Sequence, residues 1–217
     1  MNARKSTDLR FLKKILTDDE ISLVAGSGDP DAALWSMWAC KEAAYKVIQK
    51  MDSGAAFLPR RWSVLPAYVP GMQHDVCSSY SGNGAAGRWA SEVSGLVRIP
   101  GFHEMPFCLH VTRLYVHCIV SDNERALEET LWQADALPAA KKGNGSDPSS
   151  FVRSRLTAHL ARLLRCSARE IEIIRTSVEG RLQPPEVHIN SERAAIDISL
   201  SHDGDYTAYA FLFSATE

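Results

Sequence analysis

The chain has 217 residues, of which 45% are hydrophobic and 23% charged, and its formal net charge is −2. This size and composition are typical of a globular protein with a substantial core. The small net charge gives no global indication of nucleic acid or of an anionic membrane as a partner. No run approaches the roughly 18 apolar residues of a membrane span. We therefore expect neither partner, and a local basic patch must meet any anionic ligand.

The first residues and the cysteines predict a cytoplasmic protein. The start, MNARKSTDLRFLKK, lacks the apolar stretch and the small-residue cleavage site of a secretory signal. The five cysteines are scattered, odd in number and without a C-x-x-C pair, which argues against a disulfide framework. We expect them to be reduced thiols.

Residues 1–51 are expected to form a helical N-terminal part. Thr17 has the position of an N-cap, and Glu20 follows at the spacing of a capping box. After a break rich in Gly, Ser and Pro, Asp31 is expected to cap a long helix. That helix should run to about Lys50, because apolar residues recur there at helical spacing.

Residues 52–125 are expected to form a β-rich inserted block. Prolines punctuate short runs such as RWSVLPAYV, SEVSGLVRI and CLHVTRLYVHCIV, which favour a meander or hairpins over helices. The segment SGNGAAGR at 81–88 lacks the Gly-Lys-Ser/Thr ending of a phosphate loop and also the G-x-G-x-x-G spacing. We therefore interpret it as a hairpin tip.

Two helices separated by a polar linker are expected next. ERALEETLWQADAL at 124–137 has the pattern of a helix, and PAAKKGNGSDPSS at 138–150 that of a linker. Ser149 or Ser150 is expected to cap the second helix, which should end near Cys166. Its apolar stripe is expected to comprise Val152, Leu156, Leu160 and Leu163.

The last fifty residues have the alternation of strands. IEIIRTSVEGRLQPPEVHI resembles one hairpin, and AIDISLSHDGDYTAYAFLF resembles another with its turn at 203–205. The fold class is therefore α+β, with an antiparallel sheet packed on a long helix. We expect one domain over 1–217, made of the parts 1–51, 52–125 and 126–217.

Two short segments carry charged or polar groups that could do chemistry. In WACKEAAYK at 38–46, Glu42 and Lys46 are four residues apart and share a helix face with Trp38; taken alone, a surface ion pair is the ordinary interpretation. In SLSHDG, Ser201 and His202 end a strand before a tight turn. There, short polar side chains and backbone N–H groups can meet a phosphate, although an exposed or structural histidine is the ordinary interpretation.

Together these segments resemble the 4′-phosphopantetheinyl transferase superfamily. WACKEAAYK fits the helix motif W/F-x-x-K-E-A-x-x-K at every specified position, and DISLSHDGDYTAYAF fits the strand motif that ends in S-H. RFLKKILTDDEI also resembles the segment F-x-x-R-x-[LF]-T-x-x-E ahead of the helix. The matches cover residues 10–50 and 180–213, about a third of the chain.

The resemblance implies a fold and an activity. The fold would be that of these transferases, with the antiparallel sheet on a long helix and, as one alternative, two pseudo-symmetric lobes. The activity would be transfer of the phosphopantetheine arm of coenzyme A to a serine of an acyl or peptidyl carrier protein, with Mg²⁺ required. Adenosine 3′,5′-bisphosphate would be the other product. The order of the motifs resembles that of the holo-[acyl-carrier-protein] synthases, which implies a possible homo-oligomer; a second lobe within one chain is the alternative.

The resemblance also implies roles for individual residues. Glu42 would hold Mg²⁺, and Lys46 would neutralise phosphate charge or help to deprotonate the attacking serine. Ser201 and His202 would contact the 3′-phosphate end of coenzyme A. Lys41 is expected to be solvated. Arg60 and Arg61 match no motif, so a surface position is expected for them.

The family's second metal carboxylate has no clear counterpart in this sequence. No G-[IV]-D-[ILV] segment occurs on an N-terminal strand, and no G-x-D-x-E segment follows the S-H strand. Asp8 is one candidate for this ligand, and Asp197 or an acid of the inserted block is another. A sequence that begins inside a longer protein would also explain the gap. The remaining alternative is a noncatalytic module that binds coenzyme A or a carrier protein within a larger assembly.

Two further groups of residues have ordinary and functional interpretations. His103, His110 and His117 recur at intervals of seven, with Glu104 beside the first. We expect packed or exposed histidines, with a metal site as the alternative. A basic outer face on the helix before Cys166 is expected to be solvated, with docking of an acidic carrier protein as the alternative. Its arginines are Arg153, Arg155, Arg162 and Arg165.

Overall fold

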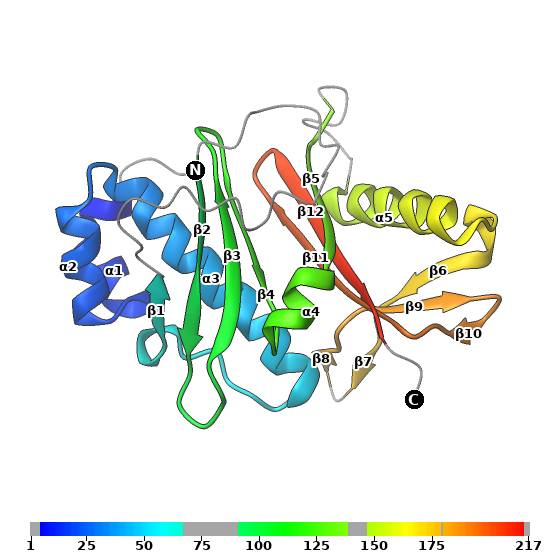
Figure 1. The fold of residues 1–217 in the computed structure, drawn as a ribbon, viewed down its shortest axis with the longest axis horizontal. Coiled ribbons are helices and arrows are strands. Elements are labelled where there is room, and N and C mark those ends of the chain that lie inside the picture. Colours follow the sequence, from blue (N-terminus) through cyan, green and yellow to red (C-terminus); the bar gives the residue numbers. More distant parts are fainter. Residues whose placement is uncertain (1–4, 67–90, 139–146, 179, 215–217) are drawn as a thin grey trace. The chain divides into compact units, whose positions relative to one another are not determined.

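The computed structural model describes residues 5–66, 91–138, 147–178 and 180–214 (Figure 1). Helices and antiparallel sheets occur together, so the α+β class is confirmed. The described residues fall into two compact units, an N-terminal unit up to residue 128 and a C-terminal unit from residue 129. Within the described ranges, no helix has the length and apolar character needed to cross a membrane.

The helices of the N-terminal unit come first in the chain. The capping box is confirmed: the Glu20 amide donates to Thr17 Oγ1 at 3.2 Å, and the Thr17 amide donates to Glu20 Oε2 at 2.8 Å. The helical elements are η1 (Lys5–Thr7), α1 (Leu9–Ile15), α2 (Asp18–Gly26), α3 (Pro30–Met51), η2 (Pro59–Arg61) and α4 (Glu124–Glu129).

The cap of α3 differs from the prediction. Asp29, not Asp31, is the N-cap, and its side chain accepts a hydrogen bond from the Ala32 amide at 3.0 Å. The reason is Pro30, whose fixed φ and missing N–H suit the first helical position, so the helix begins there. Asp31 lies in the first turn and accepts a hydrogen bond from the Ser6 amide at 3.2 Å.

The β-rich expectation is confirmed for the strands of the N-terminal unit. They form an antiparallel sheet in chain order, and the segment 81–88 lies outside the described residues. Gly95 is needed where it is, because a Cβ there would lie 2.3 Å from the Leu65 carbonyl oxygen. The strands are β1 (Ser63–Pro66), β2 (Ser91–Arg98), β3 (Met105–Val111) and β4 (Val116–Val120).

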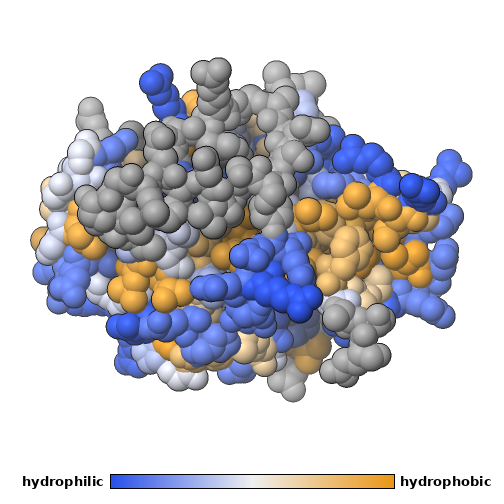
Figure 2. Space-filling view, in the orientation of Figure 1, coloured by the Kyte–Doolittle hydropathy of each residue, from blue (hydrophilic) through white to orange (hydrophobic). Residues whose placement is uncertain are grey.

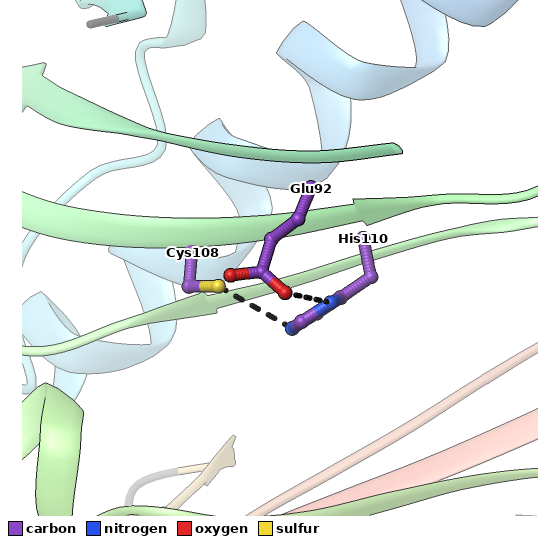
Figure 3. Close-up of side chains that lie close together, drawn as sticks. All are labelled: Glu92, Cys108 and His110. Carbon is purple, nitrogen blue, oxygen red and sulfur yellow. Dashed lines mark hydrogen bonds and ion pairs between the residues drawn. The ribbon is translucent and has the colours of Figure 1, made fainter. Parts of the chain in front are cut away.

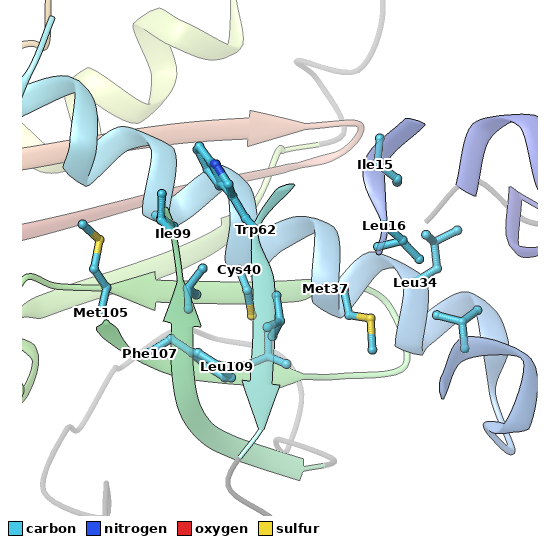
Figure 4. Close-up of a cluster of buried hydrophobic side chains, with 14 of the residues drawn as sticks. Ile15, Leu16, Leu34, Met37, Cys40, Trp62, Ile99, Met105, Phe107 and Leu109 are labelled. Atoms are coloured by element: carbon cyan, nitrogen blue, oxygen red, sulfur yellow. The ribbon is translucent and has the colours of Figure 1, made fainter. Parts of the chain in front are cut away.

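One face of this sheet packs against α3 and forms the core of the unit (Figure 4). Phe107 and Leu109 of β3 point into this core, as does Cys118 of β4, whose Sγ lies 3.5 Å from the Cys40 Sγ of α3. Because side chains alternate along a strand, Cys108 and His110 point to the opposite face. The sheet therefore has an apolar face and a second face that carries polar groups.

The C-terminal unit consists of α5 (Pro148–Leu164) and short antiparallel sheets. Val152, Leu156 and Leu160 of α5 are buried against strands of both three-stranded sheets. The strand orders are β11-β12-β5, β10-β9-β6 and β7-β8. The elements are β5 (Leu131–Ala136), η4 (Ala168–Glu170), β6 (Ile171–Ile174), β7 (Ser177–Val178), β8 (Arg181–Leu182), β9 (Glu186–Ile189), β10 (Glu192–Arg193), β11 (Ile196–Asp203) and β12 (Tyr206–Phe213).

Both C-terminal hairpins of the prediction are confirmed. Strands β6 and β9 pair, with the small β7–β8 hairpin between them, and β11 pairs with β12 along eight residues each. The tight turn lies at 203–205, where Gly204 has a φ of +52°, a left-handed conformation that glycine adopts without strain.

The helix predicted over 124–137 is wrong beyond its first half. Helix α4 ends at Glu129, and the following residues form β5, which pairs with β12 from Leu131 to Ala136. The apolar spacing of this segment is compatible with either structure. The hydrogen bonds that β12 offers decide in favour of a strand, and β12 lies 70 to 80 residues further along the chain.

The start and the stripe of α5 also differ from prediction. The N-cap is Asp147, which accepts hydrogen bonds from the amides of Ser149 and Ser150, and Pro148 again occupies the first position. Neither serine is therefore the cap. Leu163 is 44% exposed and lies outside the buried stripe, because the core beneath α5 ends at Leu160.

The face shown in Figure 2 has hydrophilic and apolar areas, and one apolar area lies where Figure 1 draws strands of the C-terminal unit. The large exposed hydrophobic residues of that unit are Leu163, Leu164, Val178, Leu182 and Phe213.

A chain of hydrogen bonds joins α5 to the sheet in the C-terminal unit. Tyr209 Oη donates to Gln133 Oε1 at 2.7 Å and lies 2.9 Å from His159 Nδ1. Gln133 Nε2 in turn donates to Asp135 at 2.9 Å, and Arg155 Nε donates to the same carboxylate at 3.1 Å. Burial raises the pKa of Tyr209 to about 12, so this phenol stays protonated as a donor.

Tyr209→Phe is expected to lower the free energy of unfolding by about 1–3 kcal/mol, because it leaves Gln133 and His159 each without their hydrogen bond to the phenol. Urea unfolding followed by circular dichroism measures this change. A double-mutant cycle with His159→Leu isolates the coupling between the two side chains. A loss below about 0.3 kcal/mol in the single variant would contradict the structural role of the phenol.

Candidate functional site

The WACKEAAYK segment lies in the middle of α3, between an apolar face and an exposed one. The buried residues recur every three or four positions, as a helix packed on one side requires. They are Leu34, Met37, Cys40, Lys41, Ala44 and Ile48. Lys41 belongs to the buried set, whereas its neighbour Glu42 is exposed. The motif therefore places adjacent charges in opposite environments.

Lys41 is completely buried, so the expectation of a solvated side chain is wrong. Its ammonium group donates to the Ile15 and Pro59 carbonyl oxygens, both at 2.9 Å, and to Glu20 Oε2 at 2.5 Å. These three acceptors match the three protons of the ammonium group. Burial lowers the pKa of Lys41, and the charge of Glu20 opposes this effect.

Glu20 connects the buried lysine to several segments of the N-terminal unit. Its Oε2 also accepts from the Thr17 amide that it caps, and its Oε1 accepts from the Val64 amide of β1 at 2.9 Å. The Lys41–Glu20 pair therefore ties α3 to the start of α2, to β1 and, through Pro59, to η2. We interpret it as the anchor that fixes the rotation of α3 and so directs Glu42 outward.

The exposed side of the motif carries Glu42, with Lys46 partly buried one turn later. Trp38, four residues before Glu42, packs edge-on against Phe57 with ring centroids 5.6 Å apart. The pKa of His117 is lowered by burial first, then by the charge of His110 and, least of the three, by the positive charge of Lys46. A carboxylate and an ammonium group thus occupy one side of a helix whose opposite side is fixed in the core.

Asp8 has a structural task at the start of α1. Its side chain caps that helix by accepting from the Phe11 amide at 3.0 Å, and this hydrogen bond is the main cause of its lowered pKa. Two residues earlier, the Ser6 amide donates to Asp31 in the first turn of α3. Asp31 and Glu42 are eleven residues apart, about 16 Å along a helix. The Ser6–Asp31 hydrogen bond thus holds this part of the chain near the first turn of α3, about three helical turns before Glu42.

Arg60 and Arg61 follow Pro59 in η2, and the Pro59 carbonyl oxygen accepts from Lys41. Arg60 is exposed and lies 3.6 Å from the exposed carboxylate of Asp18. An exposed pair of this kind contributes little to stability, so the surface position expected for these arginines agrees with the structure.

Ser201 and His202 lie at the end of β11 in the C-terminal unit. Ser201 Oγ is 3.5 Å from the Ala208 carbonyl oxygen of β12, and His202 is exposed opposite Thr207. The pKa of Asp147, the cap of α5, is lowered mainly by the Ser150 hydroxyl and the Ser149 amide, with a smaller contribution from His202. The charge of His202 at the end of β11 therefore acts on the carboxylate that caps α5.

The candidate residues are thus divided between the two units. Glu42 and Lys46 belong to the N-terminal unit, and Ser201 and His202 belong to the C-terminal unit. Within each unit the two residues are neighbours along one element, α3 or β11.

A second group of polar side chains lies on the sheet face that does not pack on α3. His110 of β3 and His117 of β4 are direct cross-strand partners with stacked rings 6.4 Å apart. Burial lowers the pKa of His110 to about 4. Burial and the charge of His110 together lower the pKa of His117 to about 3. His103 is elsewhere, with its Nε2 2.8 Å from the Asp122 carbonyl oxygen. The spacing of seven therefore brings only two of the three histidines together.

Glu92 and Cys108 complete this group and were missed by reasoning from the sequence. Figure 3 shows their side chains converging with that of His110. The alternation Cys-x-His on β3 is a signal that could have linked two of the three. Glu92 comes from the neighbouring strand β2, and only the register of β2 with β3 places it opposite His110.

Comparison with known proteins gives one finding. Residues 2–75 match the family model of the 4′-phosphopantetheinyl transferase superfamily. No curated protein and no solved structure matches the chain significantly. The matched segment contains Glu42 and Lys46 and ends before Ser201 and His202. The resemblance to the 4′-phosphopantetheinyl transferase superfamily, a superfamily of phosphopantetheine transferases, is thereby confirmed over the N-terminal third of the chain.

Proposed function

We propose that this protein transfers the 4′-phosphopantetheine group of coenzyme A to a serine of an acyl or peptidyl carrier protein. The serine oxygen forms a new bond to the phosphorus of the arm, the pyrophosphate linkage breaks, and adenosine 3′,5′-bisphosphate leaves. The enzyme would be of the holo-[acyl-carrier-protein] synthase type and act in the cytoplasm on lipid or related biosynthesis. Its partners would be coenzyme A and the carrier protein.

The observation that carries the proposal is the position of Glu42 within the matched segment. Its carboxylate is exposed, on a helix whose rotation is fixed by the buried contacts of Lys41. The pairing of an anchored lysine with an adjacent outward carboxylate gives the K-E order of the motif a physical reason.

Glu42 is suited to hold the Mg²⁺ that the superfamily implies. Mg²⁺ prefers hard oxygen donors and is typically bound by one or two carboxylates together with substrate phosphates. When bound, it supplies charge neutralisation at the pyrophosphate being cleaved. Asp8 is engaged as a helix cap, so we do not assign it as the second carboxylate.

Lys46 and the S-H strand would act on the rest of the substrate. Lys46, one turn after Glu42, would neutralise phosphate charge or help to remove the proton of the attacking serine. Ser201 and His202 would hold the 3′-phosphate of coenzyme A. Both residues lie at the end of β11 beside the tight turn at 203–205, and this position supports the role.

The experiment incubates the full chain with an apo acyl carrier protein, coenzyme A and Mg²⁺, and follows the carrier protein by mass spectrometry. A gain equal to one phosphopantetheine arm, dependent on Mg²⁺, is the expected result. No gain with several carrier proteins would reject the transferase. If coenzyme A still bound in calorimetry, the noncatalytic binding module would be the function instead. The noncatalytic module stays an alternative because no second carboxylate is assigned to the Mg²⁺ site.

A further inference from the structure

The polar face of the N-terminal sheet carries a compact set of ligand-type side chains that the proposed transfer does not use. Glu92, His110 and His117 lie in one row across β2, β3 and β4, as direct cross-strand partners. Cys108 precedes His110 by two residues and therefore points to the same face. Four side chains of the types that bind transition metals thus lie on adjacent positions of a regular sheet.

Three of these side chains lie close together, with Cys108 and Glu92 at different nitrogens of the His110 ring. The Cys108 Sγ lies 3.4 Å from His110 Nε2, and a Glu92 carboxylate oxygen lies 3.5 Å from His110 Nδ1. One ligand-type atom from each of the three residues lies within 4.8 Å of the others. Figure 3 shows one Glu92 oxygen directed toward the Cys108 sulfur and the other toward the imidazole. Around a tetrahedral zinc ion, ligand atoms lie roughly 3.3–3.8 Å apart, given bonds of about 2.0–2.3 Å. A rotation of one side chain would bring the sulfur and the carboxylate oxygen to the same imidazole nitrogen.

The burial of Cys108 and His110 favours a metal-binding site over a group of solvated side chains. Cys108 is 5% exposed and His110 is 3% exposed, while Glu92 reaches the group from a more exposed position. A buried thiol and imidazole exclude competing water, and the partly exposed carboxylate side leaves a route of entry. The strands that carry the ligands are fixed by ladder hydrogen bonds, so the backbone positions of the three residues are set before any ion binds.

Cys108, His110 and Glu92 could also act as a nucleophile, a base and an acid that orients the base. The environment argues against that chemistry. The buried position of Cys108 keeps a large substrate away from the sulfur. An imidazole nitrogen and a thiolate sulfur are both common ligands of transition metals.

We propose that Cys108, His110 and Glu92 form a binding site for a divalent transition metal of the zinc type. The thiolate sulfur, one imidazole nitrogen and a carboxylate oxygen are the three protein ligands, and the thiol proton leaves to solvent on binding. The fourth position is open to water or to His117, which faces His110 on the next strand. This set differs in chemistry from the all-oxygen environment expected for Mg²⁺ at Glu42.

Titration of the metal-free full chain with Co²⁺ tests the proposal. A cobalt–thiolate bond gives a charge-transfer band in the near ultraviolet, whereas cobalt on carboxylates alone does not. We expect a band that saturates at one equivalent and is bleached by Zn²⁺. The band should be lost in Cys108→Ser and retained in Cys166→Ser, whose thiol lies in the C-terminal unit.

Glu92→Gln provides a second variant that does not disturb a buried group. It should weaken Co²⁺ binding at least about tenfold, the usual effect of changing a ligand or its hydrogen-bonded carboxylate. Circular dichroism confirms that each variant is folded. Absence of the band in the wild type, or a band unchanged in Cys108→Ser, would overturn the site. A Co²⁺ affinity that Glu92→Gln leaves unchanged would overturn the three-ligand set.

Discussion

Lys41→Ala is expected to lower the free energy of unfolding of the N-terminal unit by about 3–5 kcal/mol, the usual cost of breaking a buried ion pair by removing one partner. The variant leaves the Glu20 carboxylate buried without its cation and removes the donor of the Ile15 and Pro59 carbonyl oxygens. It also leaves a cavity beside α3. Equilibrium unfolding in urea measures the change.

Two further variants separate the causes. Lys41→Met retains most of the side-chain volume and removes the charge, so a loss similar to that of Lys41→Ala assigns the effect to the ion pair. Lys13→Ala, an exposed lysine of α1, is the matched control and should change the stability by less than about 0.5 kcal/mol. A loss below about 1 kcal/mol in both Lys41 variants would contradict the anchoring role.

The double variant Lys41→Met/Glu20→Leu provides a further check on this account. Replacing both partners of a buried ion pair by apolar residues is often close to neutral. Here we expect only partial recovery, because Glu20 also accepts hydrogen bonds from the amides of Thr17 and Val64. Recovery to the full stability of the wild type would show that these two backbone contacts contribute little.

Glu42→Gln is expected to reduce phosphopantetheine transfer at least about a hundredfold, the scale seen when a group that stabilises transition-state charge is removed. The substitution keeps the size of the side chain and removes the negative charge that would hold Mg²⁺. Because Glu42 is exposed, the stability of the fold should change little. Single-turnover mass spectrometry of the carrier protein at saturating coenzyme A measures the rate.

Asp19→Asn serves as the matched control, since it removes an exposed carboxylate from the neighbouring helix α2. Its transfer rate should remain within about twofold of the wild type. A higher Mg²⁺ concentration should partly restore the transfer rate of Glu42→Asp but not that of Glu42→Gln, because only the aspartate variant retains a carboxylate. A Glu42→Gln enzyme as fast as the wild type would remove this residue from the catalytic assignment.

Local sequence determined the helices that carry the motif. The capping box of Thr17 and Glu20 and the long apolar periodicity that continues to about Lys50 are signals within a few residues of each other, and both are present in the structure. The turn at 203–205 is local in the same sense, because Gly204 permits a positive φ. The resemblance to the superfamily also came from short motifs, and it is confirmed over residues 2–75.

Tertiary contacts decided the remaining features. The segment 131–136 is a strand because β12 pairs with it, and its own spacing allowed a helix. Lys41 is buried because Glu20 and two carbonyl oxygens surround it, whereas the motif alone gave adjacent charges without saying which one faces the core. Glu92 meets Cys108 and His110 only through the register of separate strands. Long-range pairing and burial depend on residues far apart in the chain, and local patterns do not contain this information.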